Sequence, residues 1–203
     1  AGQTNRLIER LKEDGKSVVT LSFPRYGQES ARSVEEYLAG KFGPPDKVDA
    51  YQASQFYAID RRGAAPEIRA ALDRGDVVVL DRYTPSNAGH QGGKMKDPEA
   101  RAKFIAWLYH FEYQELGIPR PDLVVILRVP VEVSLKLIEA RGRSKDGHEA
   151  NTEHLRNAEA TYVWLAEQYP DDHVLVECVE DGAMLSPEKI SEKVYALVEP
   201  FVS

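Results

Sequence analysis

Short, largely apolar runs that alternate with long helical segments constrain the fold of this chain most strongly. Runs at 17–23, 76–81, 122–129 and 173–179 have the length and composition of strands that are buried on both faces. Strands that alternate with helices predict an α/β fold whose parallel sheet is flanked by helices on both faces. Helices are predicted over the first residues, where Leu7, Ile8 and Leu11 precede Gly15, over 30–39, 49–74, 98–115, 130–141 and 149–168, and after a cap formed by Ser186, Pro187 and Glu188.

The size and charge of the chain exclude several classes of protein. Its 203 residues, 42% hydrophobic and 29% charged, suffice for one domain with a substantial core. Acidic residues outnumber basic ones 33 to 26 and no long run of Lys or Arg occurs, so we expect no nucleic-acid partner. No apolar stretch approaches the roughly 18 residues of a membrane span, and the first residues form an amphipathic pattern rather than a signal peptide. We therefore expect a cytoplasmic protein with no membrane partner.

The strongest chemical signal is the pair Asp81 and Arg82 at the end of the run at 76–81. Charges at the end of a buried parallel strand need partners, and the carboxyl edge of such a sheet is where ligands bind. The pair therefore indicates a ligand or metal site. A structural ion pair is the alternative.

Two further groups of residues fit a planar, anionic ligand. Phe23, Arg25 and Tyr26 follow the first run and so fall on the same edge of the sheet, where aromatic rings and a guanidinium could wall and clamp the ligand. Tyr57 and Arg61 lie four residues apart on one helix face and could hold a base by stacking and hydrogen bonding. For the first group, the alternative is an ordinary loop interrupted by proline. For the second, it is a core tyrosine beside a surface arginine.

Other polar features are weaker. The basic segment 141–147 is either a solvated connector or a loop that closes over phosphates, since guanidinium groups match phosphate oxygens. We reject a zinc site at His148, Glu149 and His154, because histidines six apart do not share a helix face. Cys178, the only cysteine, lies in an apolar run and is interpreted as a core residue.

Several segments together resemble the thymidylate kinases, nucleoside monophosphate kinases of the P-loop type. They are FPRYGQ, FYAIDR, VVVLDRYTPSNAGHQ, GIPRPDLVVILRV, and a basic segment followed by HEANTEHLRNAEATYVWLA. The resemblance implies a single domain over residues 1–203 with a short basic lid at about 141–149. It also implies transfer of the γ-phosphoryl group from ATP to dTMP, with Mg²⁺ as cofactor, in a homodimer.

The resemblance assigns roles to individual residues. Asp81 matches the acidic residue beside the magnesium ion and the phosphates, and Arg82 the arginine that grips the acceptor monophosphate. Tyr57 matches an aromatic residue that stacks on thymine, and Arg61 an arginine that reaches the base. The further positions carried over are Phe23, Arg25 and Tyr26 beside the acceptor, Ser86 and Asn87 at its phosphate and base, Arg141, Arg143 and Lys145 as lid groups that act on the donor phosphates, and Asp146 and Glu149 as acidic lid residues near the acceptor.

Two features depart from the family pattern. His90 stands where many members have a tyrosine that crowds out a ribose 2′-hydroxyl, so selection of deoxyribose is open. The family also begins with a strand and a GxxxxGK phosphate loop, and alignment of TNRLIERL with its first helix places Ala1 just after that lysine. We expect that the 203 residues are a fragment of a longer protein and do not include this strand and loop. The alternatives are a non-catalytic nucleotide-binding remnant and a deoxynucleoside kinase, in which Arg82 would not grip a monophosphate.

Overall fold

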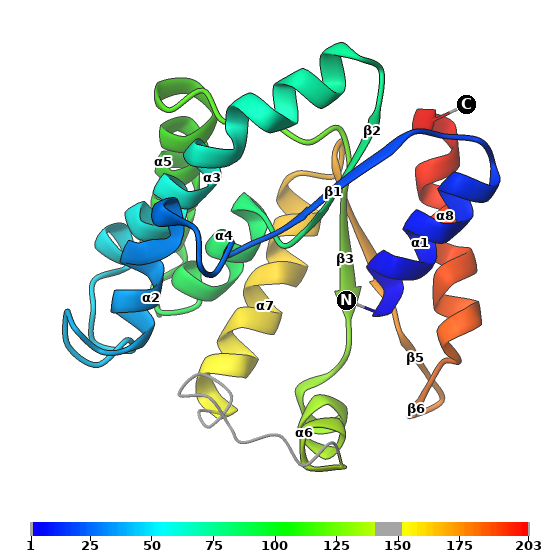
Figure 1. The fold of residues 1–203 in the computed structure, drawn as a ribbon. Coiled ribbons are helices and arrows are strands. Elements are labelled where there is room, and N and C mark those ends of the chain that lie inside the picture. Colours follow the sequence, from blue (N-terminus) through cyan, green and yellow to red (C-terminus); the bar gives the residue numbers. More distant parts are fainter. Residues whose placement is uncertain (1, 141–151, 203) are drawn as a thin grey trace.

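The computed structural model describes residues 2–140 and 152–202, which form an α/β fold (Figure 1). The strands are β1 (Val18–Ser22), β2 (Val77–Asp81), β3 (Val124–Arg128) and β4 (His173–Glu177), with a small hairpin of β5 (Val179–Glu180) and β6 (Ala183–Met184). The helices are α1 (Gly2–Glu13), α2 (Arg32–Leu38), α3 (Ala50–Asp73), α4 (Thr84–Gly92), α5 (Pro98–His110), α6 (Val131–Ala140), α7 (Thr152–Gln168) and α8 (Pro187–Val202), with a 3-10 turn η1 (Glu29–Ala31) and a π turn η2 (Phe111–Glu115).

The local signals in the sequence largely determine where these elements begin. The side chain of Asp49 accepts hydrogen bonds from the first backbone amides of α3, and Ser186 caps α8 as predicted. The four predicted strands are confirmed. No helix is predicted over 84–92, where α4 lies, because its apolar periodicity is interrupted by two glycines. Cys178 is buried in an apolar cluster, which confirms the core assignment.

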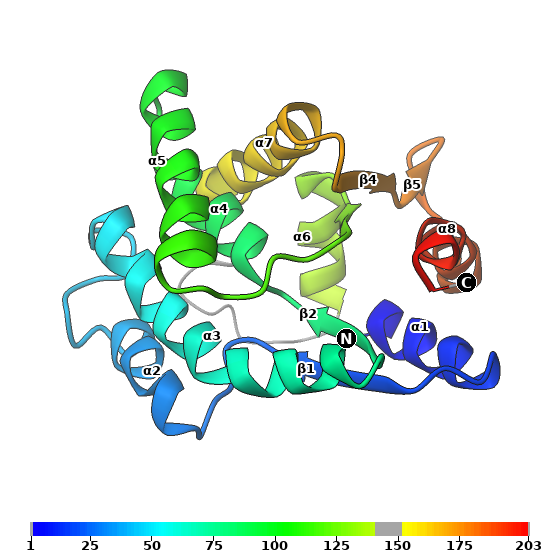
Figure 2. The ribbon, with the colours of Figure 1, turned by 90° about the horizontal axis from the view of Figure 1, so that it is seen from above.

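The strands form two parallel pairs with helices on both faces. Val18 pairs with Val77 at one end of β1 and β2, and Val124 pairs with His173 at one end of β3 and β4. Helices α1 and α8 cover one side, whereas α3 and α7 pack on the other (Figures 1 and 2). The predicted fold class is confirmed. Within residues 2–140 and 152–202, however, the two pairs are not joined by hydrogen bonds into one sheet.

A slot separates the two strand pairs, with β2 on one side and β3 on the other. It belongs to a cavity of about 1050 Å³, lined by residues of both strands and by side chains from α1 and α8. All five residues of β2 are only half-buried, and Leu127 of β3 is 41% exposed. Central strands of parallel sheets are normally covered on both faces and paired on both edges. The slot therefore exposes apolar strand edges of the kind that another strand covers.

Helix contacts on either side hold the two strand pairs together. Between α1 and α8, Arg10 lies 3.6 Å from the centre of the Tyr195 ring, and Arg6 pairs with Glu188 at 2.9 Å. Between α4 and α7, Gly89 lies so close to Tyr162 that a Cβ atom there would come within 2.4 Å of the ring. Only glycine permits this approach. The slot is thus bounded by packed helices on both sides.

Candidate active site

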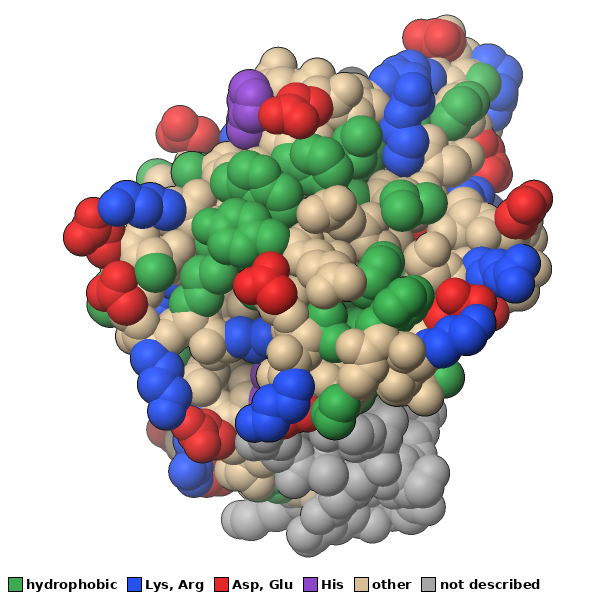
Figure 3. Space-filling view, turned by 90° about the vertical axis from the view of Figure 1, so that its left-hand side faces the viewer, with side chains coloured by type: hydrophobic (Ala, Val, Ile, Leu, Met, Phe, Trp, Pro, Cys, Tyr) green, Lys and Arg blue, Asp and Glu red, His purple; other side chains and the backbone are tan. Residues whose placement is uncertain are grey.

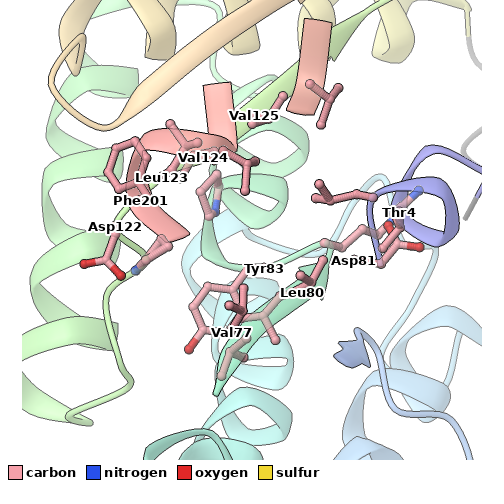
Figure 4. A pocket seen from close by; sticks show the side chains of 18 of the residues that line it. Thr4, Val77, Leu80, Asp81, Tyr83, Asp122, Leu123, Val124, Val125 and Phe201 are labelled. Carbon is pink, nitrogen blue, oxygen red and sulfur yellow. The ribbon is translucent and has the colours of Figure 1, made fainter. Parts of the chain in front are cut away.

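Asp81 and Arg82 mark the carboxyl end of β2 and line the same cavity as Ser86 and His90. Figure 4 shows Asp81 near the Thr4 end of α1, at one end of the slot. Arg82 has a φ of 64°, a left-handed backbone conformation that is uncommon outside glycine and is often found at functional sites. The Arg82 side chain is exposed and makes no ion pair with another residue that the structure describes. The guanidinium can therefore meet an incoming anion.

The loop after β1 is fastened to α3 through Arg25. Its Nε donates to the Asp60 carboxylate at 3.1 Å, its backbone N–H donates to the same carboxylate at 2.7 Å, and its Nη2 donates to Ser30 at 2.9 Å. Asp60 is buried, so the pair is a fixed attachment rather than a surface contact. Phe23 lies in the core against Tyr83, whereas Tyr26 is 62% exposed. Of the three predicted residues in this loop, Tyr26 is therefore the most accessible to a ligand.

Tyr57 lies on α3 and packs, partly buried, against an apolar cluster that contains Tyr37 and Val48. Its ring meets that of Tyr37 edge to face, with centroids 6.0 Å apart. Burial raises the pKa of Tyr57 most, nearby tyrosines add to the increase, and the positive charges of Arg82 and Arg61 oppose it. The positive charges of both arginines therefore act on the Tyr57 hydroxyl, which relates Arg82 at the end of β2 to the pair on α3 that the sequence analysis selected.

Arg61 is buried and forms a two-point ion pair with Glu112. Its Nε and Nη2 donate to the two carboxylate oxygens at 2.6 Å each, and both side chains are almost completely inaccessible. Thr84 donates to the same carboxylate at 2.7 Å, and the Asn87 amide approaches it at 3.4 Å. The alternative of a surface arginine is wrong. The Nη1 group takes no part in the two contacts with Glu112.

His90 lies on α4, where its ring faces α7. Its Nδ1 is 3.3 Å from Nε2 of His154, and its ring meets Tyr162 edge to face. At the position where the family pattern predicts discrimination between deoxyribose and ribose, this chain therefore has a histidine that contacts α7. The predicted lid residues Arg141, Arg143, Lys145, Asp146 and Glu149 lie outside the described residues.

The sequence analysis did not select Glu112, Thr84 or Asp60. Glu112 had a signal, because it follows Phe104 and Leu108 at four-residue spacing and so places a charge on the apolar face of a helix. Such a charge requires a buried partner. The partner could not be named, since Arg61 lies 51 residues away in the sequence.

Asp81 lies where a metal ion could bind beside a ligand. Among the residues that the structure describes, no group of three or more histidine, cysteine or acidic side chains could hold a metal ion. Magnesium typically binds one or two carboxylates, substrate phosphates and waters. Asp81, at the strand end beside exposed Arg82, supplies such a carboxylate.

Across the parts of the chain that the structure describes, no helix is both long and apolar enough to cross a bilayer.

Parallel strands between two layers of helices, with an acidic–arginine pair where a strand ends, are features of α/β proteins that bind ligands at the carboxyl edge of the sheet. The family model described as Thymidylate kinase matches residues 2–181, and the chain belongs to this family.

Individual relatives agree with the family assignment. A thymidylate kinase of Mycobacterium tuberculosis is 36% identical over 172 residues, which cover 80% of this chain and 79% of that protein. One from Pseudomonas putida is 33% identical over 181 residues, covering 87% and 83% respectively. A probable thymidylate kinase of Pyrococcus abyssi is 28% identical over 199 residues, covering 97% and 88%. The similarity therefore extends over most of both chains, in bacteria and in an archaeon.

Proposed function

We propose that this protein transfers the γ-phosphoryl group of ATP to dTMP, forming dTDP and ADP, as a cytoplasmic step towards dTTP. The family assignment supports the reaction. The observation that carries it in this chain is a base-sized aromatic ring, Tyr57, on the same helix as the buried, ion-paired Arg61, together with the exposed Arg82 where β2 ends. Arg61 is neutralised by Glu112, as suits a group that reads an uncharged base. Arg82 is exposed, as suits a group that binds a phosphate.

In this proposal the acceptor lies between α3 and the end of β2. Tyr57 stacks on the pyrimidine, while Arg61 and Asn87 face its polar edge. Arg82 holds the monophosphate, with Ser86 beside it in the same cavity. Catalysis then consists of positioning the two nucleotides and neutralising the charge on the transferring group, because phosphoryl transfer requires little covalent work from the protein.

Asp81 is the residue that would hold Mg²⁺, which would bridge donor phosphates and screen their charge. The lid arginines and lysine at 141, 143 and 145 remain proposed donor-phosphate groups. We also propose that the slot between β2 and β3 accommodates one more parallel strand, followed by a phosphate-binding loop. The half-buried apolar side chains on both sides of the slot support this proposal.

A homodimer would use the face formed by α3 and α5. Figure 3 shows hydrophobic side chains gathered on this side of the molecule. Tyr51 and Trp107 lie 4.6 Å apart between ring centroids, Trp107 stacks on Phe111 at 5.2 Å, and Ile59 is 49% exposed. Aromatic residues on an exposed apolar face are typical of an interface. Sedimentation of the wild type and of Trp107→Glu tests this, since the substitution should shift a dimer to monomer.

The proposed reaction is tested by comparing acceptors. In a chain extended by a strand and a GxxxxGK loop, dTMP should be phosphorylated by ATP and Mg²⁺, and thymidine should not. Preferential phosphorylation of thymidine would instead make the protein a deoxynucleoside kinase. Product identification by chromatography separates dTDP from dTMP in each case.

A further inference from the structure

Two imidazole rings from different helices meet where α4 packs against α7. His90 lies on α4, and His154 lies in the first turn of α7. Nδ1 of His90 and Nε2 of His154 are 3.3 Å apart, and the two ring planes differ by only 17°. The ring centres are 5.5 Å apart, so the two nitrogens lie between them and face one another. Both nitrogens are therefore directed into the same small space.

Close packing of the two helices holds the pair at this separation. A Cβ atom at Gly93 on α4 would come within 3.0 Å of the backbone nitrogen of Ala158 on α7. The Tyr162 hydroxyl donates to the Ser86 carbonyl at 3.4 Å, and the ring of Tyr162 meets that of His90 edge to face. Ligands that are fixed on packed helices lose little freedom when an ion binds, because they are already positioned.

The distance between the two nitrogens matches that of two ligands on one metal ion. On a tetrahedral zinc ion, two nitrogens that each lie about 2.0–2.1 Å from the metal are about 3.3–3.4 Å apart. The observed 3.3 Å is just beyond the usual range of about 2.7–3.2 Å for a hydrogen bond from N–H to oxygen. Imidazole nitrogen suits zinc, copper and nickel, whereas Mg²⁺ prefers oxygen ligands.

We propose that His90 and His154 together bind one transition-metal ion of the zinc class. Each neutral ring donates the lone pair of its facing nitrogen, and the proton between the rings moves to the opposite ring nitrogen, as in the other imidazole tautomer. His90 also lines the large cavity, so water or an oxygen anion from there completes the tetrahedron. The bound ion links α4 to α7. The inference does not rest on the proposed phosphoryl transfer.

Calorimetric titration of the 203-residue chain with Zn²⁺ at neutral pH, in excess Mg²⁺, tests the site. The wild type should bind one Zn²⁺ at this pair, and its melting temperature should rise, because an ion that binds only the folded chain stabilises it. His90→Asn and His154→Gln each replace the facing nitrogen by an amide, a poor ligand for zinc. Each should weaken Zn²⁺ binding about tenfold or more, since even loss of an outer partner of a zinc ligand costs about 10–100-fold.

The matched control is His110→Gln, at an exposed histidine on α5 that lies 3.4 Å from Glu115. It should leave the Zn²⁺ affinity unchanged. Absence of Zn²⁺ binding by the wild type, or unchanged affinity in either folded variant, overturns the proposal. If one variant does not fold, the other decides, because loss of either ligand must weaken binding.

Co²⁺ in place of Zn²⁺ gives a second measurement that needs no variant. Four-coordinate Co²⁺ absorbs visible light much more strongly than the six-coordinate hydrated ion. The wild type should therefore develop this absorption when Co²⁺ is added, and prior addition of Zn²⁺ should prevent it. A spectrum that stays that of the hydrated ion overturns the proposal. Failure of either test leaves the proposed reaction untouched, because dTMP binding is measured without Zn²⁺ or Co²⁺.

Discussion

The acceptor region and the slot differ in how completely their groups are satisfied. Around Glu112, charges are paired, hydrogen bonds cross between α3, α4 and η2, and almost no surface is accessible. Along the slot, β2 and β3 expose apolar side chains, and each pairs with a neighbouring strand on only one edge within the described residues. The difference teaches that the residues proposed to recognise the acceptor are already organised by hydrogen bonds and ion pairs, whereas the region proposed to hold the donor phosphates is not.

The largest expected effect concerns phosphoryl transfer itself. The 203 residues contain no GxxxxGK sequence, and the amides and lysine of such a loop stabilise charge in the transition state. We expect ATP-dependent turnover of dTMP by this chain to be lower by about 10³-fold or more than in a chain extended by that strand and loop. A coupled assay of ADP formation with both proteins measures this. Equal rates of ADP formation by the two proteins would contradict the proposed difference between the acceptor region and the slot.

The next effect concerns stability. Arg61→Ala leaves Glu112 buried without its cation and should lower the free energy of unfolding by about 3–5 kcal/mol, as measured in urea. The double variant Arg61→Met with Glu112→Leu should recover most of the loss, since an apolar pair replaces the ion pair. Leu127→Ala, in the slot, should cost clearly less because that side chain is 41% exposed. A larger loss of unfolding free energy for Leu127→Ala than for Arg61→Ala would contradict the difference described between the slot and the region around Glu112.

Stacking on Tyr57 gives a smaller effect that separates the acceptor site from the core. Tyr57→Ala should weaken dTMP and dCMP similarly, by about 1–3 kcal/mol, because every pyrimidine offers a face for stacking. Calorimetry gives the affinities, and a melting curve shows whether the variant is folded. A core role alone would lower the melting temperature and leave the affinity of the folded protein unchanged.

The smallest effect is a pH dependence at the edge of the acceptor region. Lys94 donates to the carbonyls of Pro45 and Val48, and burial lowers its pKa to about 8, against the opposing influence of Asp46 and Asp49. In the unfolded chain the pKa is about 10.4. Between these values the unfolded state binds more protons, so the Lys94 contribution to stability increases as pH rises from about 8 towards 10. Lys94→Met should reduce this slope in urea titrations, and an unchanged slope would show that Lys94 is not its source.

Parts of this arrangement could be predicted from the sequence, because they depend on local patterns. The apolar run that ends at Asp81 and the helix that carries Tyr57 and Arg61 are both set by periodicity and caps. The pairing of Arg61 with Glu112 depends instead on how α3 and η2 pack, which no local pattern contains. The helix at 84–92 was missed because close packing against α7 requires glycines that weaken its helical signal.

The central claim is that the acceptor site is already formed in this chain, and binding of dTMP and thymidine tests it most directly. If Arg82 meets the monophosphate, dTMP should bind more tightly than thymidine by about 1.5–3 kcal/mol, the value of a charge-assisted hydrogen bond. Arg82→Ala should remove that difference and leave thymidine affinity unchanged, whereas Arg32→Ala, at an exposed arginine on α2, should leave both affinities unchanged. Equal calorimetric affinities of the wild type for dTMP and thymidine would contradict the claim.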